Sequence, residues 1–272
     1  MTLGEVLRLS AEYLERKGVD SPRLDAELLL GKALGLSRLD LYLHHDRPLT
    51  GPERDAAREL VRRRGEREPL AYVLGEWGFR RLTLRCDPRA LVPRPETEVV
   101  VERCLELLAG VEAPRILDVG TGTGAIALAL ADEHPGARVT GLDCSAPALA
   151  LARENAEATG IAIELVEGDA AAGLPSGPWD LVVSNPPYVL AGEELPPELA
   201  FEPRAALIDE GQTEAIARHA RASLRGPLVL EVHAEHAAKA AALLDSLGYR
   251  EVRITGDLAG RERVVEGRWQ QQ

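Results

Sequence analysis

The stretch LDVGTGTGAIAL, residues 117–128, decides the fold because an apolar run meets a glycine-rich turn and then a helix-forming segment. The apolar run over 115–119 is expected to be a buried strand. Gly120, Gly122 and Gly124 let the backbone approach a ligand closely, and the helix N-terminus that follows presents free N–H groups. The order of strand, turn and helix therefore predicts a ligand-binding turn at one edge of a parallel sheet.

Strands and helices continue to alternate after this turn. The expected strands are 115–119, 138–143, 161–166, 180–184 and 228–232, and the expected helices are 125–133, 146–158, 213–224 and 235–247. The segment RITGDLAGRERVVEGR, 253–268, indicates two strands around a glycine-containing turn. An α/β fold is predicted, with helices on both faces of a mostly parallel sheet and an antiparallel C-terminal hairpin.

The preceding part of the chain has a different pattern. Residues 3–75 show apolar residues at helical spacing and no strand signal, so residues 1–75 are expected to form a small helical bundle. Alternating residues and prolines over 76–96 predict a hairpin or linker. Residues 97–272, which begin with a helix, are expected to form the α/β domain.

Composition limits the classes of function. None of the apolar stretches reaches the roughly 18 to 20 residues of a membrane span, and the first residues lack the pattern of a signal peptide, so a cytoplasmic protein without membrane contact is expected. The net charge of -12 argues against broad nucleic-acid binding. The three arginines at 62–64 are expected on a solvated helix face, or as a patch for acidic partners. The three cysteines lack metal-ligand spacing, and no metal is expected.

The glycine-rich turn alone does not identify the ligand. Gly120-x-Gly122-x-x-Ala125 also fits the fingerprint of dinucleotide-binding proteins, in which an acidic residue follows about twenty positions later. Asp143 ends the second strand at that place, where a carboxylate accepts hydrogen bonds from ribose hydroxyls. A nicotinamide-dependent dehydrogenase is therefore one alternative, although the chain has no fitting catalytic histidine, tyrosine–lysine pair or cysteine.

Two further acids favour S-adenosylmethionine. Asp118 precedes the glycines, where it can orient the turn or meet the ligand's ammonium group through water. Asp169, which follows the third strand, is placed to accept a bond from the adenine amino group. Both suit a ligand with an ammonium and a sulfonium centre, whereas a pyrophosphate favours fewer acids nearby.

The sequence NPPY at the end of the fourth expected strand indicates the chemistry. Pro186 and Pro187 fix the backbone and donate no N–H, so the carbonyls of Asn185 and Pro186 can remain aimed at a substrate. A substrate amide or amino group can donate one N–H to the Asn185 side-chain oxygen and the other to a proline carbonyl. The lone pair of the substrate nitrogen then faces a methyl-sulfonium, and Tyr188 is placed to stack on a planar substrate group.

Taken together, these motifs resemble the HemK-type protein-(glutamine-N5) methyltransferases, which methylate the glutamine of the Gly-Gly-Gln loop of bacterial peptide chain release factors. The resemblance spans nearly the whole chain. It is carried by EPLAYVLGEWGF at 68–79, LVPRPETE at 91–98, LDVGTGTGAIALALA at 117–131, SNPPY at 184–188, FEPRAAL at 201–207 and LAGRERVV at 258–265.

This resemblance implies a Rossmann-like class I methyltransferase with a seven-stranded sheet. The helical domain would recognise the release factor, and the protein would act as a monomer without sequence-specific contacts to nucleic acid. Asn185, Pro186, Pro187 and Tyr188 would be the catalytic residues. The residues implied to bind S-adenosylmethionine, and its product S-adenosylhomocysteine, are Asp118, Gly120, Thr121, Gly122, Thr123, Gly124, Asp143, Asp169, Ala170 and Asn185.

Some positions depart from the family pattern. Ala170 stands where similar proteins often have an aromatic residue, and Glu210 where they usually have glycine. After the fifth strand, the usual acid plus glycine is replaced by Glu231-Val232-His233. A ribosomal-protein glutamine remains an alternative substrate. A third alternative is an adenine amino group in nucleic acid, since NPPY is shared with such methyltransferases.

Overall fold

The computed structural model describes residues 1–189, 192, 195–257 and 259–269. Contacts divide the chain into two compact units, which are described separately. One unit comprises Met1–Glu76 and Leu195–Phe201, and the other comprises Trp77–Glu194 and Glu202–Gln272. The segment 195–201 lies far along the sequence from the rest of the first unit, and its inclusion there was not predicted from the sequence.

The first unit is helical, as its sequence predicts. Its elements are α1 (Leu3–Arg16), α2 (Pro22–Leu34), α3 (Arg38–Leu43), α4 (Gly51–Gly65), α5 (Leu70–Leu74) and a 3-10 turn, η1 (Pro197–Phe201). Helices α1, α3 and α4 begin with reciprocal capping boxes, in which the hydroxyl of Thr2, Ser37 or Thr50 caps the backbone. Leucines that recur at helical spacing, among them Leu7 and Leu29, fill the core of this unit.

One of the three consecutive arginines contradicts the expectation of a solvated face. Arg62 lies exposed between Glu59 and Glu66, whereas Arg64 is buried. The Arg64 Nε donates to Asp25 at 2.7 Å, and its Nη1 donates to Glu198 at 3.1 Å. Arg64 turns inward because two acids supplied by other segments compensate its charge, a pairing that periodicity cannot reveal.

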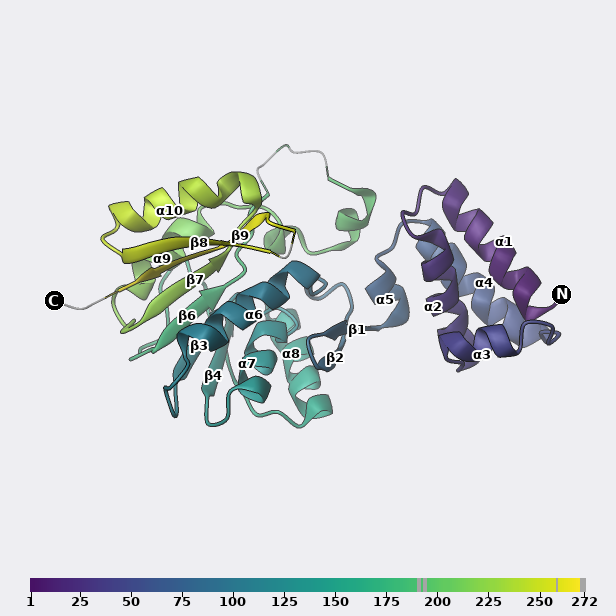
Figure 1. Cartoon of the computed structure of the whole chain (residues 1–272), viewed down its shortest axis with the longest axis horizontal. Coiled ribbons are helices and arrows are strands. Elements are labelled where there is room, and N and C mark those ends of the chain that lie inside the picture. The colour runs from purple at the N-terminus through teal and green to yellow at the C-terminus, as the bar shows by residue number, and fades with distance from the viewer. Residues whose placement is uncertain (190–191, 193–194, 258, 270–272) are drawn as a thin grey trace. The chain divides into compact units, whose positions relative to one another are not determined.

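The second unit contains a seven-stranded sheet in the order β5-β4-β3-β6-β7-β9-β8, and this confirms the predicted sheet (Figure 1). Neighbouring strands from β5 to β7 run parallel, while β9 is antiparallel to β7 and to β8. A separate hairpin precedes the sheet. The strands are β1 (Glu76–Phe79), β2 (Leu82–Arg85), β3 (Arg115–Val119), β4 (Arg138–Asp143), β5 (Glu164–Glu167), β6 (Leu181–Ser184), β7 (Pro227–Glu231), β8 (Arg250–Gly256) and β9 (Glu262–Arg268).

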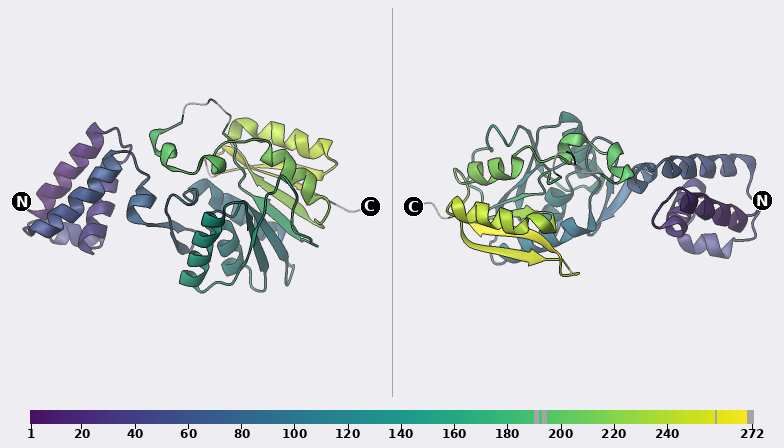
Figure 2. Two further views of the ribbon diagram at one scale, coloured as in Figure 1. Left: turned by 180° about the vertical axis from the view of Figure 1, so that it is seen from behind. Right: turned by 90° about the horizontal axis from the view of Figure 1, so that it is seen from above.

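Helices cover both faces of this sheet (Figures 1 and 2). The remaining elements are α6 (Pro95–Leu107), α7 (Ala125–Glu133), α8 (Ala146–Thr159), α9 (Gln212–Ala220), α10 (Ala237–Ser246), and the 3-10 turns η2 (Arg204–Ala206) and η3 (Ala234–His236). Successive strand residues face opposite layers. Ile116 packs in the core beneath α6 and α7, whereas Leu117 packs in the core beneath α9 and α10.

Several element boundaries differ from the sequence expectation, those of β5 and α9 among them. The third strand of the sheet begins at Glu164 rather than 161, and its pairing with β4 begins there, opposite Thr140. Helix α9 ends at Ala220 rather than 224, because the backbone at Leu224 forms a bridge with Trp179. Position 258, which stands between β8 and β9 in the sequence, lies outside the described residues. In the described part of the chain, no helix has the length and apolar character to cross a bilayer.

Candidate active site

The glycine-rich turn joins β3 to α7 and is fixed to the end of β4. The backbone N–H groups of Gly120 and Thr121 both donate to the carbonyl oxygen of Leu142, at 2.7 and 3.0 Å. Gly120, Gly122 and Gly124 have φ values of 74°, 55° and 83°, a left-handed conformation that favours glycine. The backbone therefore needs the glycines that the sequence places there.

Asp118 lies beneath the turn and orients it. The carboxyl is fully buried, and Asp118 Oδ2 accepts a hydrogen bond of 2.7 Å from the Thr121 hydroxyl. Burial raises the pKa of this carboxyl to about 7, although the bond from Thr121 opposes the shift. Of the two roles considered for Asp118, this contact supports orientation of the turn. Asp118 is not among the described residues that line the nearby cavity.

Asp143, at the end of β4, lines that cavity and anchors two backbone segments. Its Oδ2 accepts from the Gly122 N–H and its Oδ1 accepts from the Ser145 N–H, both at 2.9 Å. Burial raises the pKa of this carboxyl despite these bonds. Ser145 caps α8 by accepting from the Ala148 N–H, so Asp143 is not needed as the cap and is available as a wall residue of the cavity.

The acid after β5 reaches the same cavity. Asp169 is exposed, and its Oδ1 accepts a hydrogen bond of 2.8 Å from the Ala171 N–H. Gly168, Asp169 and Ala170 all line the cavity. The methyl group of Ala170 supplies an apolar contact there, without the stacking area of an aromatic ring.

The cavity has a volume of about 250 Å³ and its walls come from distant parts of the second unit. It brings together the glycine-rich turn, the ends of β4 and β5, and Asn185, Pro186 and Pro187 after β6. The hydroxyl of Ser184 donates to the Val119 carbonyl oxygen at 2.7 Å, which joins the end of β6 to the end of β3. Such a crevice at the carboxyl ends of parallel strands is the expected ligand site of this kind of sheet.

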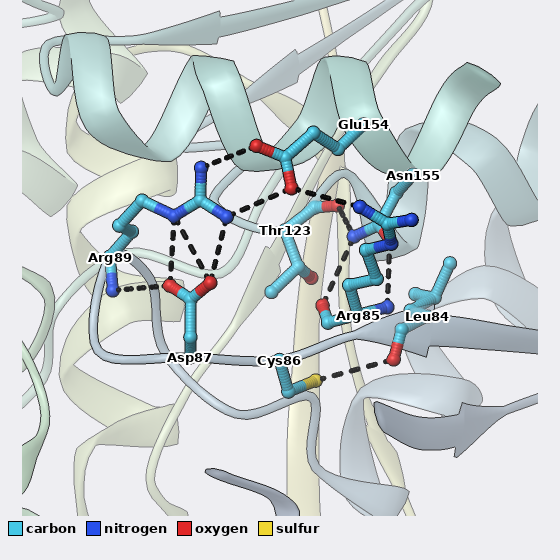
Figure 3. Close-up of polar contacts among 8 residues, drawn as sticks. All are labelled: Leu84, Arg85, Cys86, Asp87, Arg89, Thr123, Glu154 and Asn155. Atoms are coloured by element: carbon cyan, nitrogen blue, oxygen red, sulfur yellow. Dashed lines mark hydrogen bonds and ion pairs between the residues drawn. The ribbon is translucent and has the colours of Figure 1, made fainter. Parts of the chain in front are cut away.

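The segment 89–94 forms a further wall of the cavity, and sequence reasoning missed it. Asn155 of α8 ties the preceding hairpin to the turn: its Oδ1 accepts from the Arg85 N–H, and its Nδ2 donates to the carbonyl oxygens of Arg85 and Thr123 (Figure 3). The Arg89 guanidinium is paired with Asp87 and Glu154. These contacts hold the segment across the cavity.

The segment FEPRAAL contributes a wall and also anchors 89–94. Pro203, Ala205 and Ala206 line the cavity. Glu202 is buried, accepts a 3.0 Å hydrogen bond from the Val92 N–H and forms an ion pair with Arg94.

The nitrogen and the oxygen of the Asn185 carboxamide have different surroundings. Its Nδ2 donates to the Thr97 hydroxyl at 3.4 Å, whereas its Oδ1 is buried and has no hydrogen-bond partner among the described residues. A buried acceptor without a partner carries a free-energy cost unless a ligand satisfies it. The Oδ1 of Asn185 is therefore the natural acceptor for a substrate N–H.

Tyr188 is placed differently from its neighbours. It is not among the described residues that line the cavity, and its ring centroid lies 6.2 Å from that of His233. Burial raises the pKa of the tyrosine hydroxyl. The predicted stacking of Tyr188 on the substrate stays a prediction.

The cavity residues fit S-adenosylmethionine. Asp143 and Asp169 provide carboxylate acceptors for hydroxyl and amino groups, and the glycine-rich turn allows close approach of the ligand to the backbone. Apolar side chains such as Leu142 and Ile126 complete the walls. Two acids suit a ligand that carries positive charge.

Comparison with known proteins identifies relatives across both parts of the chain. Residues 5–75 match the family described as PrmC N-terminal domain, and residues 97–225 match the methyltransferase small domain. The release factor glutamine methyltransferase of Chlorobaculum tepidum is 44% identical over 272 residues, covering 93% of this chain and 92% of that protein. Its counterpart in Deinococcus radiodurans is 44% identical over 279 residues, covering 98% and 99%.

A solved structure shares the fold of the second unit. The ribosomal protein L11 methylase of Lactobacillus delbrueckii subsp. bulgaricus is 20% identical, covers 69% of this chain and 86% of its own, and has a TM-score of 0.52. The sheet, its crevice and these matches define a class I methyltransferase that depends on S-adenosylmethionine. More particularly, the chain belongs to the release factor glutamine methyltransferase family, and this confirms the resemblance noted in its sequence.

Proposed function

We propose that the protein methylates the side-chain amide nitrogen, N5, of the glutamine in the Gly-Gly-Gln loop of peptide chain release factors. The relatives are named for the release factor and for glutamine. The observation that carries the proposal is the Asn185 Oδ1, a buried acceptor beside the cavity to which no described residue donates a hydrogen bond. A primary amide in the substrate has N–H groups to donate to it.

When bound, S-adenosylmethionine supplies an electrophilic methyl group. The residues of the chain position the glutamine and stabilise the positive charge that develops on its nitrogen. Asn185 Oδ1 accepts one N–H, and Pro186 and Pro187 keep the adjoining backbone rigid without adding competing donors. Charge developing on the nitrogen strengthens a hydrogen bond to a fixed oxygen, which favours the transition state over the ground state.

The proton balance requires no dedicated base in this scheme. The nitrogen gains a methyl group and loses one proton, and that proton becomes acidic as the new bond forms. Water or a carbonyl oxygen suffices as its acceptor. Orientation of the amide is then the main contribution of the protein to the rate.

The direct test is mass spectrometry of a purified release factor after incubation with the protein and S-adenosylmethionine. One added methyl group on the Gly-Gly-Gln peptide is expected, and none on a release factor whose glutamine is replaced by alanine. Asn185→Ala should reduce turnover roughly a hundredfold while the affinity for the product cofactor changes little. Methyl incorporation into a ribosomal protein or nucleic acid, with none in the release factor, would refute the substrate assignment.

We also propose that the helical region, residues 1–75, recognises the body of the release factor, with 76–96 as a linker and 97–272 as the catalytic domain. The match of 5–75 to a family-specific N-terminal domain supports this division. An intact release factor should then be methylated with a kcat/KM at least about a hundredfold above that of an isolated loop peptide. Equal values would contradict a recognition role. Action as a monomer in the cytoplasm, without nucleic-acid binding, completes the proposal.

A further inference from the structure

What Asn185 offers to a substrate depends on the direction in which its carboxamide is turned. A carboxamide carries two N–H donors on one atom and an acceptor on the other, in nearly the same shape. The Nδ2 of Asn185 faces the Thr97 hydroxyl at 3.4 Å, and the Oδ1 is buried and has no partner in the part of the chain that the structure describes. Reversal of the amide would present donors to a substrate group that itself donates.

Thr97 is positioned between Asn185 and a buried acid. It lies in the first turn of α6 and is 4% exposed, and its hydroxyl interacts with the Glu231 carboxyl closely enough to oppose the rise in the pKa of that acid. Glu231 is the last residue of β7, where Ser184 pairs with Leu230 of the neighbouring strand. The register therefore places the next residue of each strand, Asn185 and Glu231, beside one another at the carboxyl edge of the sheet.

The Thr97 hydroxyl has a single hydrogen to donate, so donation through the contacts that link Glu231, Thr97 and Asn185 must run in one direction. An ionised Glu231 can only accept, so it takes that hydrogen and leaves the Thr97 oxygen as an acceptor. Only the N–H end of Asn185 can then face Thr97, which turns Oδ1 away from it. We propose that Thr97 and Glu231 are positioning residues that fix the Asn185 carboxamide for methyl transfer, an inference that rests on the proposed function.

The orientation of the Asn185 carboxamide is expected to depend on pH. Burial raises the pKa of Glu231 to about 7, and Glu96 adds to the rise. A protonated Glu231 donates to Thr97, which frees the threonine hydrogen to reach a reversed amide. The charged and titratable groups that face Glu231 are Arg94 and Glu96 near the start of α6, Arg263 of β9, and Tyr188 after β6.

A measurement without substrate tests the contacts themselves. In protein labelled with nitrogen-15, the side-chain signal of Asn185 is identified by its loss in Asn185→Ala. We expect this signal to titrate with a midpoint near 7 in the unmodified protein and in Thr97→Ser. It should not titrate in that range in Thr97→Val or Glu231→Gln. A signal that does not respond in the unmodified protein, or responds equally in Thr97→Val, overturns the proposal.

Kinetics test whether the orientation serves the reaction. Thr97→Val should lower kcat for release-factor methylation about tenfold or more, and Thr97→Ser should restore it to within about threefold. In the Asn185→Ala background, Thr97→Val should add no further loss, since the residue acts only through Asn185. If Thr97→Val still lowered kcat by the same factor in the Asn185→Ala background, Thr97 would act independently of Asn185, and the proposal would be refuted.

The two proposals fail in distinguishable ways. Absence of methylation by the unmodified protein contradicts the proposed function, whereas the nitrogen-15 titration still decides whether Thr97 and Glu231 fix the amide. Normal methylation with wild-type rates in Thr97→Val contradicts only the positioning role. Calorimetric titration with S-adenosylhomocysteine provides the folding control, with an affinity within about threefold expected for Thr97→Val.

Discussion

Glu231 should destabilise the folded protein at neutral pH, because its buried carboxyl is harder to ionise in the folded state than in the unfolded state. Its pKa rises from 4.5 to about 7 on folding, chiefly through burial. For an acid whose pKa is raised, the contribution to stability is complete below the unfolded value and is lost as the pH rises through the folded value. A shift of this size corresponds to a loss on the order of 3 kcal/mol between about pH 4.5 and 7.

The perturbation that tests this is Glu231→Gln, which keeps the shape of the side chain and removes its titration. Urea unfolding is measured for both proteins at several pH values across that window. The free energy of unfolding of Glu231→Gln relative to the unmodified protein should rise with pH by on the order of 3 kcal/mol. Any constant cost of the new amide cancels in this comparison. A difference that stays flat, or falls with pH, would refute the assignment of a buried acid with a raised pKa.

Three further predictions concern the turn and the helical unit. Asp143→Ala should weaken the binding of S-adenosylhomocysteine roughly tenfold or more by calorimetry, since it removes the acceptor of the Gly122 N–H; unchanged affinity would contradict its role. Gly141→Ala should also weaken that binding, because the added Cβ would lie 2.8 Å from Thr121 Oγ1. An affinity equal to that of the unmodified protein would show that the turn can shift to accommodate the Cβ without affecting the ligand. Arg64→Met should destabilise the helical unit by about 3 kcal/mol in denaturant unfolding, whereas exposed Arg62→Met serves as the matched control; equal effects would contradict the burial argument.

The sheet and the glycine-rich turn could be predicted because their signals are local. Strand β3 is a short apolar run that leads directly into a turn with three glycines, and the positive φ values of those glycines explain why glycine is favoured there. The crevice followed from topology, because the carboxyl ends of parallel strands meet at one edge. NPPY was assigned to that edge from the strand before it.

The parts that could not be predicted depend on contacts between distant segments. Nothing local in the proline-containing segment 89–94 indicates that Glu154 and Glu202 would hold it across the cavity. Thr97 appeared only as part of a helix start, and Glu231 only as a departure from a family pattern. Glu231 lies beside Asn185 because β6 and β7, two strands far apart in the sequence, pair in this register, and Thr97 reaches Asn185 from α6.

A crystal structure of the protein with S-adenosylhomocysteine and a release factor bearing the Gly-Gly-Gln loop tests the role of Asn185 most directly. We expect the glutamine side-chain nitrogen within hydrogen-bond distance of Asn185 Oδ1, with Nδ2 still facing Thr97. A glutamine bound elsewhere, or an Asn185 side chain turned out of the cavity, would contradict the account.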